Sequence, residues 1–185
     1  MQKKQYIKDQ LRKKVSSLKK EYTQSELYNR SLEVLSVLEI TGIFQQAKTI
    51  FIYNNLEDEV QTLDFIQKWI TTKDFYLPAI ESDEIVFRQY KPSIKFKQSS
   101  FGIMEPIGED FIDYNKVDLI IIPGVAFDRK KNRMGRGKGY YDRFLTKSNA
   151  PKMGICFEFQ LFDNIPNDCN DIKMDYIVSE NELIW

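Results

Sequence analysis

The stretch "VDLIIIPGVAFDRKKNRMGRGKGYYDRFL", residues 117–145, decides the fold. It opens with a strand pattern at residues 117–122, whose apolar run of Leu119 to Ile122 stops at Pro123 and Gly124, which is typical of a strand buried on both faces of a parallel sheet. A glycine-rich basic segment follows directly. Ligands of open α/β sheets bind beyond the carboxyl ends of the strands, so this stretch predicts both the sheet and the position of a binding site.

Strand and helix patterns alternate through the rest of the chain. Apolar residues spaced by four predict a helix at residues 3–19, and Thr23 with Glu26 resembles a capping box that opens a second helix, which we expect Gly42 to end. Further helices are expected at residues 60–70 and from Tyr140 onward, and strands at residues 48–55, 75–80, 84–90, 153–157 and 175–179. The alternation predicts one domain over residues 1–185, an α/β protein with a three-layer α/β/α sandwich, a mostly parallel, Rossmann-like sheet and a local antiparallel element within residues 75–106.

The composition is that of an ordinary soluble globular protein. Of the 185 residues, 42% are hydrophobic, and 27 Lys and Arg balance 27 Asp and Glu. The neutral total argues against a protein that coats nucleic acid or an anionic membrane. No apolar run approaches the roughly 20 residues that span a bilayer, and the first residues lack the apolar core of a signal peptide. We therefore expect a cytoplasmic monomer with no nucleic-acid or membrane partner.

The chain contains no histidine, which narrows the possible chemistry. The usual general base, the usual zinc ligand and every serine or cysteine triad that uses histidine are excluded. The two cysteines, Cys156 and Cys169, lack metal-ligand spacing and are predicted to be buried free thiols. Catalysis must therefore use carboxylates, Lys and Arg, backbone amides or a bound metal.

The basic segment stands out by its local charge. Between residues 128 and 143, seven basic residues face two acidic ones, which gives +5 within a neutral chain. Glycines expose backbone N–H groups, basic side chains supply charge, and a helix that starts near Tyr140 adds its positive end, so all three favour a bound phosphate. Neither the Walker nor the Rossmann glycine pattern fits the spacing, and a solvated basic loop is the alternative. Asp142 suits Mg²⁺ beside a phosphate, or else it caps the helix or pairs with a neighbouring arginine.

Residues 118–145 closely resemble the signature of the 5-formyltetrahydrofolate cyclo-ligase family, also called 5,10-methenyltetrahydrofolate synthetases. Further segments resemble the same family in order and spacing: "KKQYIKDQLRKK" (3–14), "IFIYNNLEDEVQT" (50–62), "LPAIESDEIVFRQY" (77–90), "FGIMEP" (101–106) and "NDIKMDYIVSE" (170–180). The signature is long and unusual, and the resemblance covers nearly the whole chain.

The resemblance implies a ligase that converts 5-formyltetrahydrofolate and ATP to 5,10-methenyltetrahydrofolate, ADP and phosphate, with Mg²⁺. It implies catalytic roles for Arg136, Lys138 and Tyr140. The residues implied to contact ATP are Lys4, Lys8, Arg133, Met134, Gly135, Arg136, Gly137, Lys138, Gly139, Tyr140 and Tyr141. Those implied to contact the folate are Asn54, Glu59, Phe101, Arg136, Gly137, Lys138, Gly139 and Tyr140. Asp142 and Asp171 would hold Mg²⁺.

Two positions depart from the family pattern. Lys8 stands where the family commonly has Arg, which keeps the charge but loses the planar fork for bidentate phosphate contact. The segment "NNLED", residues 54–58, stands where many members have "LSLPG". At the basic segment itself, we expect replacement of Lys138 or Asp142 by Ala to reduce turnover far more than stability.

Two other functions compete with the ligase. The +5 segment could belong to a module that binds RNA, although the neutral total charge argues against this. A different enzyme of phosphate ligands on the same fold, such as a sugar-phosphate isomerase or an acyl-CoA transferase, would need a dedicated base or a glutamyl nucleophile in a context that the sequence does not offer. Dependence of turnover on ATP discriminates the ligase from this last class.

Overall fold

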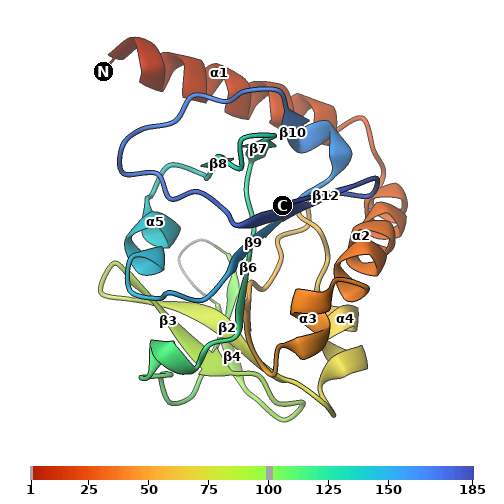
Figure 1. Cartoon of the computed structure of the whole chain (residues 1–185), viewed down its shortest axis with the longest axis vertical. Coiled ribbons are helices and arrows are strands. Elements are labelled where there is room, and N and C mark those ends of the chain that lie inside the picture. The colour runs from red at the N-terminus through yellow and green to blue at the C-terminus, as the bar shows by residue number, and fades with distance from the viewer. Residues whose placement is uncertain (1, 99–101) are drawn as a thin grey trace.

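The computed structural model describes residues 2–98 and 102–185. Its centre is a seven-stranded sheet of order β12-β11-β9-β6-β1-β2-β3 (Figure 1). Neighbours from β11 to β2 run parallel, and β12 and β3 are antiparallel edge strands. The bounds are β1 Thr49–Ile52, β2 Asp74–Glu81, β3 Glu84–Gln89, β6 Leu119–Ile122, β9 Lys152–Ile155, β11 Tyr176–Val178 and β12 Leu183–Ile184. The predicted mostly parallel sheet is confirmed.

Alternating side chains of the central strands build two cores. Ile50 and Ile52 of β1 face one side, where they join a cluster with α2 (Gln24–Glu39), α3 (Gly42–Gln46) and α4 (Leu63–Trp69). Phe51, between them, faces the other side and packs with Phe144 of α5 (Tyr140–Leu145). That second face is also covered by a small sheet of order β10-β7-β8, so the outer layer there is only partly helical.

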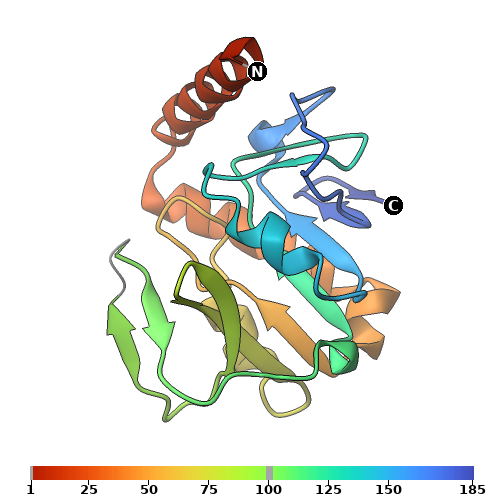
Figure 2. The same cartoon turned by 90° about the vertical axis from the view of Figure 1, so that its left-hand side faces the viewer.

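The small sheet and the last helix carry the basic segment. The sheet comprises β7 Ala126–Asp128, β8 Arg133–Met134 and β10 Leu161–Phe162. Helix α1 (Gln2–Lys19) crosses over it, and Val15 of α1 is buried against Ala126 and Met134 (Figure 1). A separate hairpin of β4 (Phe96–Gln98) and β5 (Met104–Pro106) lies beside β2 and β3. Figure 2 shows α1 above, and the hairpins β2–β3 and β4–β5 below, the loop that follows β8.

Most predicted elements are confirmed, with three corrections. The capping box of Thr23 and Glu26 is present, but Gly42 begins α3 instead of ending α2, because Thr41 caps the new helix by accepting a hydrogen bond from a backbone N–H of it. The helix expected at residues 60–70 begins only at Leu63, since Thr62 hydrogen-bonds to the segment that follows β1. Both thiols are free, but Cys169 is exposed and was wrongly predicted to be buried.

No helix in the described part of the chain combines the length and the apolar character that a membrane span requires.

Candidate functional site

A cavity of about 510 Å³ opens beyond the carboxyl ends of β1 and β6. Its wall includes most of the residues that the sequence singled out, namely Lys8, Asn54, Glu59, Arg133, Met134, Gly135, Arg136, Gly137, Lys138, Gly139, Tyr140, Tyr141, Asp142 and Asp171. Lys4 is not part of this wall, although it contacts the segment beside it. Phe101 lies outside the described residues. The cleft therefore lies beyond the carboxyl ends of the strands, where the sequence predicts a binding site.

A second cavity, of about 810 Å³, lies on the other side of residues 54–56, between α2, α4 and β5. It shares Asn54, Leu56 and Ile103 with the first cavity, but no residue of the basic loop lines it. Lys68, which does line it, is paired with a glutamate. The smaller cavity is thus the candidate site, because it combines the predicted cations with the ends of the strands.

A buried carboxylate shapes the turn that leads into the basic loop. Asp128 is fully buried at the end of β7 and accepts hydrogen bonds from the backbone N–H groups of Lys130, Asn132 and Ile165. The turn passes through Lys131, whose φ is +65°. The sequence analysis counted Asp128 only as a charge. The sequence feature that could have indicated this role is the spacing of four residues between Asp128 and Asn132, across a turn of basic residues.

Two glycines of the loop adopt backbone conformations that other residues rarely take. Gly137 has φ of +101° and Gly139 has φ of +69°. Gly139 precedes α5, so the chain can turn sharply from the cleft wall into that helix. Replacing either glycine would strain the backbone within the cleft wall.

Asp142 forms an ion pair with a buried arginine. Both of its carboxylate oxygens lie 3.0 Å from Nη2 of Arg133, whose side chain is 3% exposed. Asp142 also accepts a hydrogen bond from the N–H of Ile172, and the guanidinium stacks over the ring of Tyr141. Of the alternatives open for Asp142, pairing with a neighbouring arginine is the one that this structure contains.

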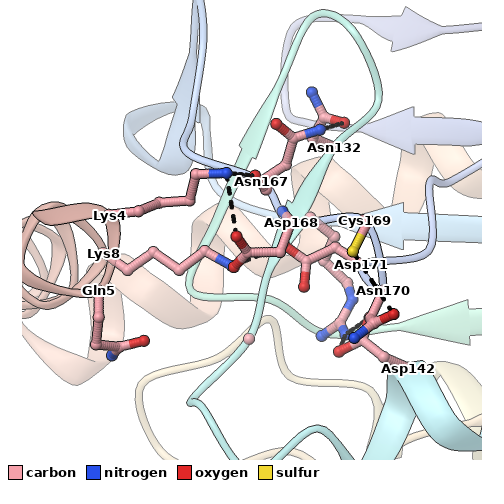
Figure 3. Close-up of polar contacts among 12 residues, drawn as sticks. Lys4, Gln5, Lys8, Asn132, Asp142, Asn167, Asp168, Cys169, Asn170 and Asp171 are labelled. Atoms are coloured by element: carbon pink, nitrogen blue, oxygen red, sulfur yellow. Dashed lines mark hydrogen bonds and ion pairs between the residues drawn. The ribbon is translucent and has the colours of Figure 1, made fainter. Parts of the chain in front are cut away.

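Helix α1 reaches the site through two lysines (Figure 3). Nζ of Lys8 lies 2.6 Å from Asp168 and 2.7 Å from Asp171, and Nζ of Lys4 lies 3.1 Å from Asp168. Burial alone would lower the pKa of Lys8, but its hydrogen bonds to the two carboxylates outweigh burial and raise that pKa. Asp168 therefore joins both lysines to one loop. The sequence analysis missed Asp168, whose partners lie 160 or more residues away.

The loop after β1 supplies acids that face the basic loop. Nη2 of Arg136 lies 2.8 Å from Asp58 and 3.1 Å from Glu59. Asp58 also pairs with Lys19 of α1 at 2.9 Å. The other oxygen of Glu59 accepts a hydrogen bond from the N–H of Leu56, which holds this carboxylate in the wall. Carboxylates thus hold Arg136 in place, as they do Lys8 and Arg133.

The wall of the cleft divides into a charged part and an apolar part. Basic side chains come from α1 and the loop after β8, whereas Pro78, Ile80, Ile85 and Ile103 line the part formed by β2, β3 and the approach to β5. Tyr141 is not suited to proton transfer near neutral pH, because burial strongly raises its pKa. The arrangement can bind a polyanion beside a flat, mostly apolar ring system.

Few side chains at the cleft could bind a metal ion. Among the described residues, no group of three or more acidic or cysteine side chains could hold a metal ion by itself. Asp142 and Asp171 both line the cleft, and Ile172, which follows Asp171, is hydrogen-bonded to Asp142. Mg²⁺ is commonly bound through one or two carboxylates together with phosphate oxygens. Two carboxylates beside a cationic loop fit Mg²⁺ that arrives with a nucleotide.

Comparison with known proteins points to one family. A family model described as the 5-formyltetrahydrofolate cyclo-ligase family matches residues 2–180. The 5-formyltetrahydrofolate cyclo-ligase of Haemophilus influenzae is 31% identical over 94% of this chain and 95% of its own length. The corresponding protein of Mus musculus is 29% identical over 75% of this chain and 76% of its own length.

Two solved structures share the fold. The 5,10-methenyltetrahydrofolate synthetase of Aquifex aeolicus is 35% identical and superposes with a TM-score of 0.86, covering 96% of this chain and 91% of its own. The 5,10-methenyltetrahydrofolate synthetase of Mycoplasma pneumoniae is 26% identical, with a TM-score of 0.74 over 94% of this chain and 99% of its own.

Proposed function

This chain belongs to the 5-formyltetrahydrofolate cyclo-ligase family and is an ATP-dependent ligase that converts 5-formyltetrahydrofolate to 5,10-methenyltetrahydrofolate, and we propose that the 510 Å³ cleft binds both substrates side by side. The observation that carries this proposal is the division of the wall. The triphosphate suits the basic loop and the lysines of α1, and the pterin suits the apolar side chains of β2 and β3. The formyl oxygen would then meet the γ-phosphate where the two parts adjoin.

The oxygen of the formyl group is a poor leaving group, and this determines the chemistry. The formyl group on N5 is an amide, so its oxygen must be activated before the ring can close. The formyl oxygen attacks the γ-phosphorus of ATP, the bond to the bridging oxygen breaks, and ADP leaves. N10 then attacks the formyl carbon and loses its proton, and the carbon–oxygen bond breaks to release phosphate. No histidine is needed, because the nucleophiles belong to the substrate.

The protein would supply positioning and charge. Arg136, Lys138 and Tyr140 would act at the reacting phosphate, and Lys4 and Lys8 together with residues 133–141 would hold ATP. Asp142 and Asp171 would bind Mg²⁺, which when bound neutralises charge on the phosphate oxygens. Asn54, Glu59 and residues 136–140 would contact the folate, and the contact expected of Phe101 stays a prediction.

The RNA-binding alternative is weakened by the ion pairs. Arg136 faces Asp58 and Glu59, and Arg129 pairs with Glu182, so acids from outside the segment offset part of its +5 charge. A surface that binds nucleic acid draws its affinity from cations that can reach phosphates freely. We further propose that the enzyme acts as a monomer, and sedimentation would test this. Cell fractionation would test the predicted cytoplasmic location.

An isotope experiment tests the phosphorylation route directly. With 5-formyltetrahydrofolate labelled with ¹⁸O in the formyl group and Mg·ATP, the label is expected in the inorganic phosphate, while methenyl absorbance rises in the near ultraviolet. Product without label in the phosphate would refute the route. Lys138→Ala is expected to abolish most turnover, and Lys130→Ala, an exposed residue of the preceding turn that does not line the cleft, serves as the matched control.

A further inference from the structure

Glu105 is a buried carboxylate in the cleft wall to which neither the sequence analysis nor the proposed mechanism gives a role. It lies in β5, is 4% exposed, and lines the cleft together with Ile80, Ile85 and Ile103. One of its oxygens accepts a hydrogen bond of 3.2 Å from the N–H of Ile80. Within the described residues, no ion pair includes Glu105.

Glu105 lines the cleft, and its second oxygen accepts none of the hydrogen bonds found among the described residues. Two side-chain atoms of the described residues, Nε1 of Trp69 and Nε of Arg133, are both fully buried and without a hydrogen bond. Oε2 of Glu105 is not one of these fully buried atoms, so a ligand can reach it. Lys97 stands opposite Glu105 in the β4–β5 ladder, but its ammonium lies 3.1 Å from Glu81. The charge of Glu105 is therefore left to a ligand.

A purely structural role accounts poorly for this residue. The end of β2 pairs with β1 only through residues 74–76, so the N–H of Ile80 needs an acceptor, and Glu105 supplies one. A neutral side chain would satisfy the same N–H. A carboxylate that is removed from water without a cation loses its hydration, and a single neutral donor replaces only a small part of it. Such a residue in a cleft is a candidate for ligand binding.

We propose that Glu105 is a further substrate-binding residue, whose second oxygen accepts a hydrogen bond from the 2-amino group of the pterin. The proposal rests on the proposed function of the cleft. A pterin presents a flat ring that suits the neighbouring isoleucines, and its 2-amino group and adjacent ring N–H are donors that match a carboxylate. Glu59 differs from Glu105 because it already faces Arg136.

Calorimetry on Glu105→Gln tests the contact. The variant is expected to weaken the binding of 5-formyltetrahydrofolate by about 10- to 100-fold, the range for a hydrogen bond to a charged group, and to leave the binding of Mg·ATP unchanged. Glu81→Gln is the matched control, because Glu81 pairs with Arg88 and Lys97 and does not line the cleft. Wild-type affinity of Glu105→Gln for the folate would overturn the proposal.

A modified substrate distinguishes a direct contact of Glu105 with the pterin from an indirect effect of the substitution on the protein structure. The wild type is expected to bind the analogue in which a methyl group replaces the 2-amino group about tenfold more weakly or worse, whereas Glu105→Gln binds the two compounds nearly alike. If the analogue loses the same factor in affinity for the wild type and for the variant, the proposal is overturned. It is also overturned if the wild type binds the analogue as tightly as the natural folate, and that measurement does not depend on a folded variant. Failure of the proposed function would appear separately, as absence of methenyl product from the wild type.

Discussion

Replacing Asp142 with Asn removes the charge that faces the buried guanidinium of Arg133 while keeping the size of the side chain. Both oxygens of Asp142 lie 3.0 Å from Nη2 of Arg133, and the two side chains are 22% and 3% exposed. Breaking a buried ion pair by neutralising one partner costs about 3 to 5 kcal/mol. Because Asp142 is partly exposed, we expect a loss of about 3 kcal/mol in the free energy of unfolding, or roughly 6 to 12 °C in Tm for a chain of this size. The structure thus changes the expectation that substitutions at Asp142 affect turnover far more than stability.

Urea unfolding followed by circular dichroism measures this loss, with an unchanged slope as the check on two-state behaviour. The double variant Arg133→Met with Asp142→Asn is expected to recover at least half of the lost stability, because no charge is left buried alone. An Asp142→Asn variant within about 0.5 kcal/mol of the wild type, which is the range of ordinary surface substitutions, would refute the reasoning.

Three further predictions concern the charges around the cleft. Lys138→Ala is expected to lower turnover by about 100-fold or more with little change in Tm, because its exposed side chain lies in the cleft wall, and steady-state kinetics with thermal unfolding checks both. Asp168→Asn is expected to raise KM for ATP and leave KM for 5-formyltetrahydrofolate unchanged, because the loss of the carboxylate that positions both Lys4 and Lys8 outweighs the removal of a competitor for phosphate, and an equal rise in both constants would contradict this. Burial would raise the pKa of Asp58, but its ion pairs and hydrogen bonds with Lys19 and Arg136 together outweigh burial and lower that pKa. Asp58 therefore stabilises the fold above its unfolded pKa, and this contribution is lost as pH falls through its folded pKa. Asp58→Asn should therefore be less stable than the wild type at pH 7 and approach it in acid below about pH 4, and a difference that persists at pH 2 would contradict the assignment.

The sheet could be predicted because its signal is local. The continuous apolar run at residues 119–122 indicates a strand buried on both faces, and β6 lies between β1 and β9 as that run requires. The small sheet could not be predicted, since β8 and β10 have two residues each and no periodicity can be read over such a length. What holds that sheet is the buried Asp128, whose hydrogen bonds reach Ile165 across 37 positions.

The cations of the site could be predicted from their sequence neighbours, and the acids could not. Lys138 and Arg136 are marked by the glycines around them, which are rare elsewhere in the chain. Asp58 and Asp168 are ordinary loop acids in sequence, and each gains its role only because the fold brings α1 over the ends of β1 and β6. Chain topology, rather than any local pattern, selects such partners.

These acids change what the basic loop can bind. A loop with +5 in sequence suggests an open electropositive surface, yet Lys8 and Arg136 are each hydrogen-bonded to two carboxylates. An incoming phosphate must compete with those carboxylates, so a singly charged anion gains little, while a triphosphate can exchange several contacts at once. The acids also fix the cations in position before binding, which reduces the entropy lost when the ligand arrives. The same arrangement therefore favours a nucleotide over smaller anions and disfavours the diffuse binding expected of a polyanion on an exposed basic patch.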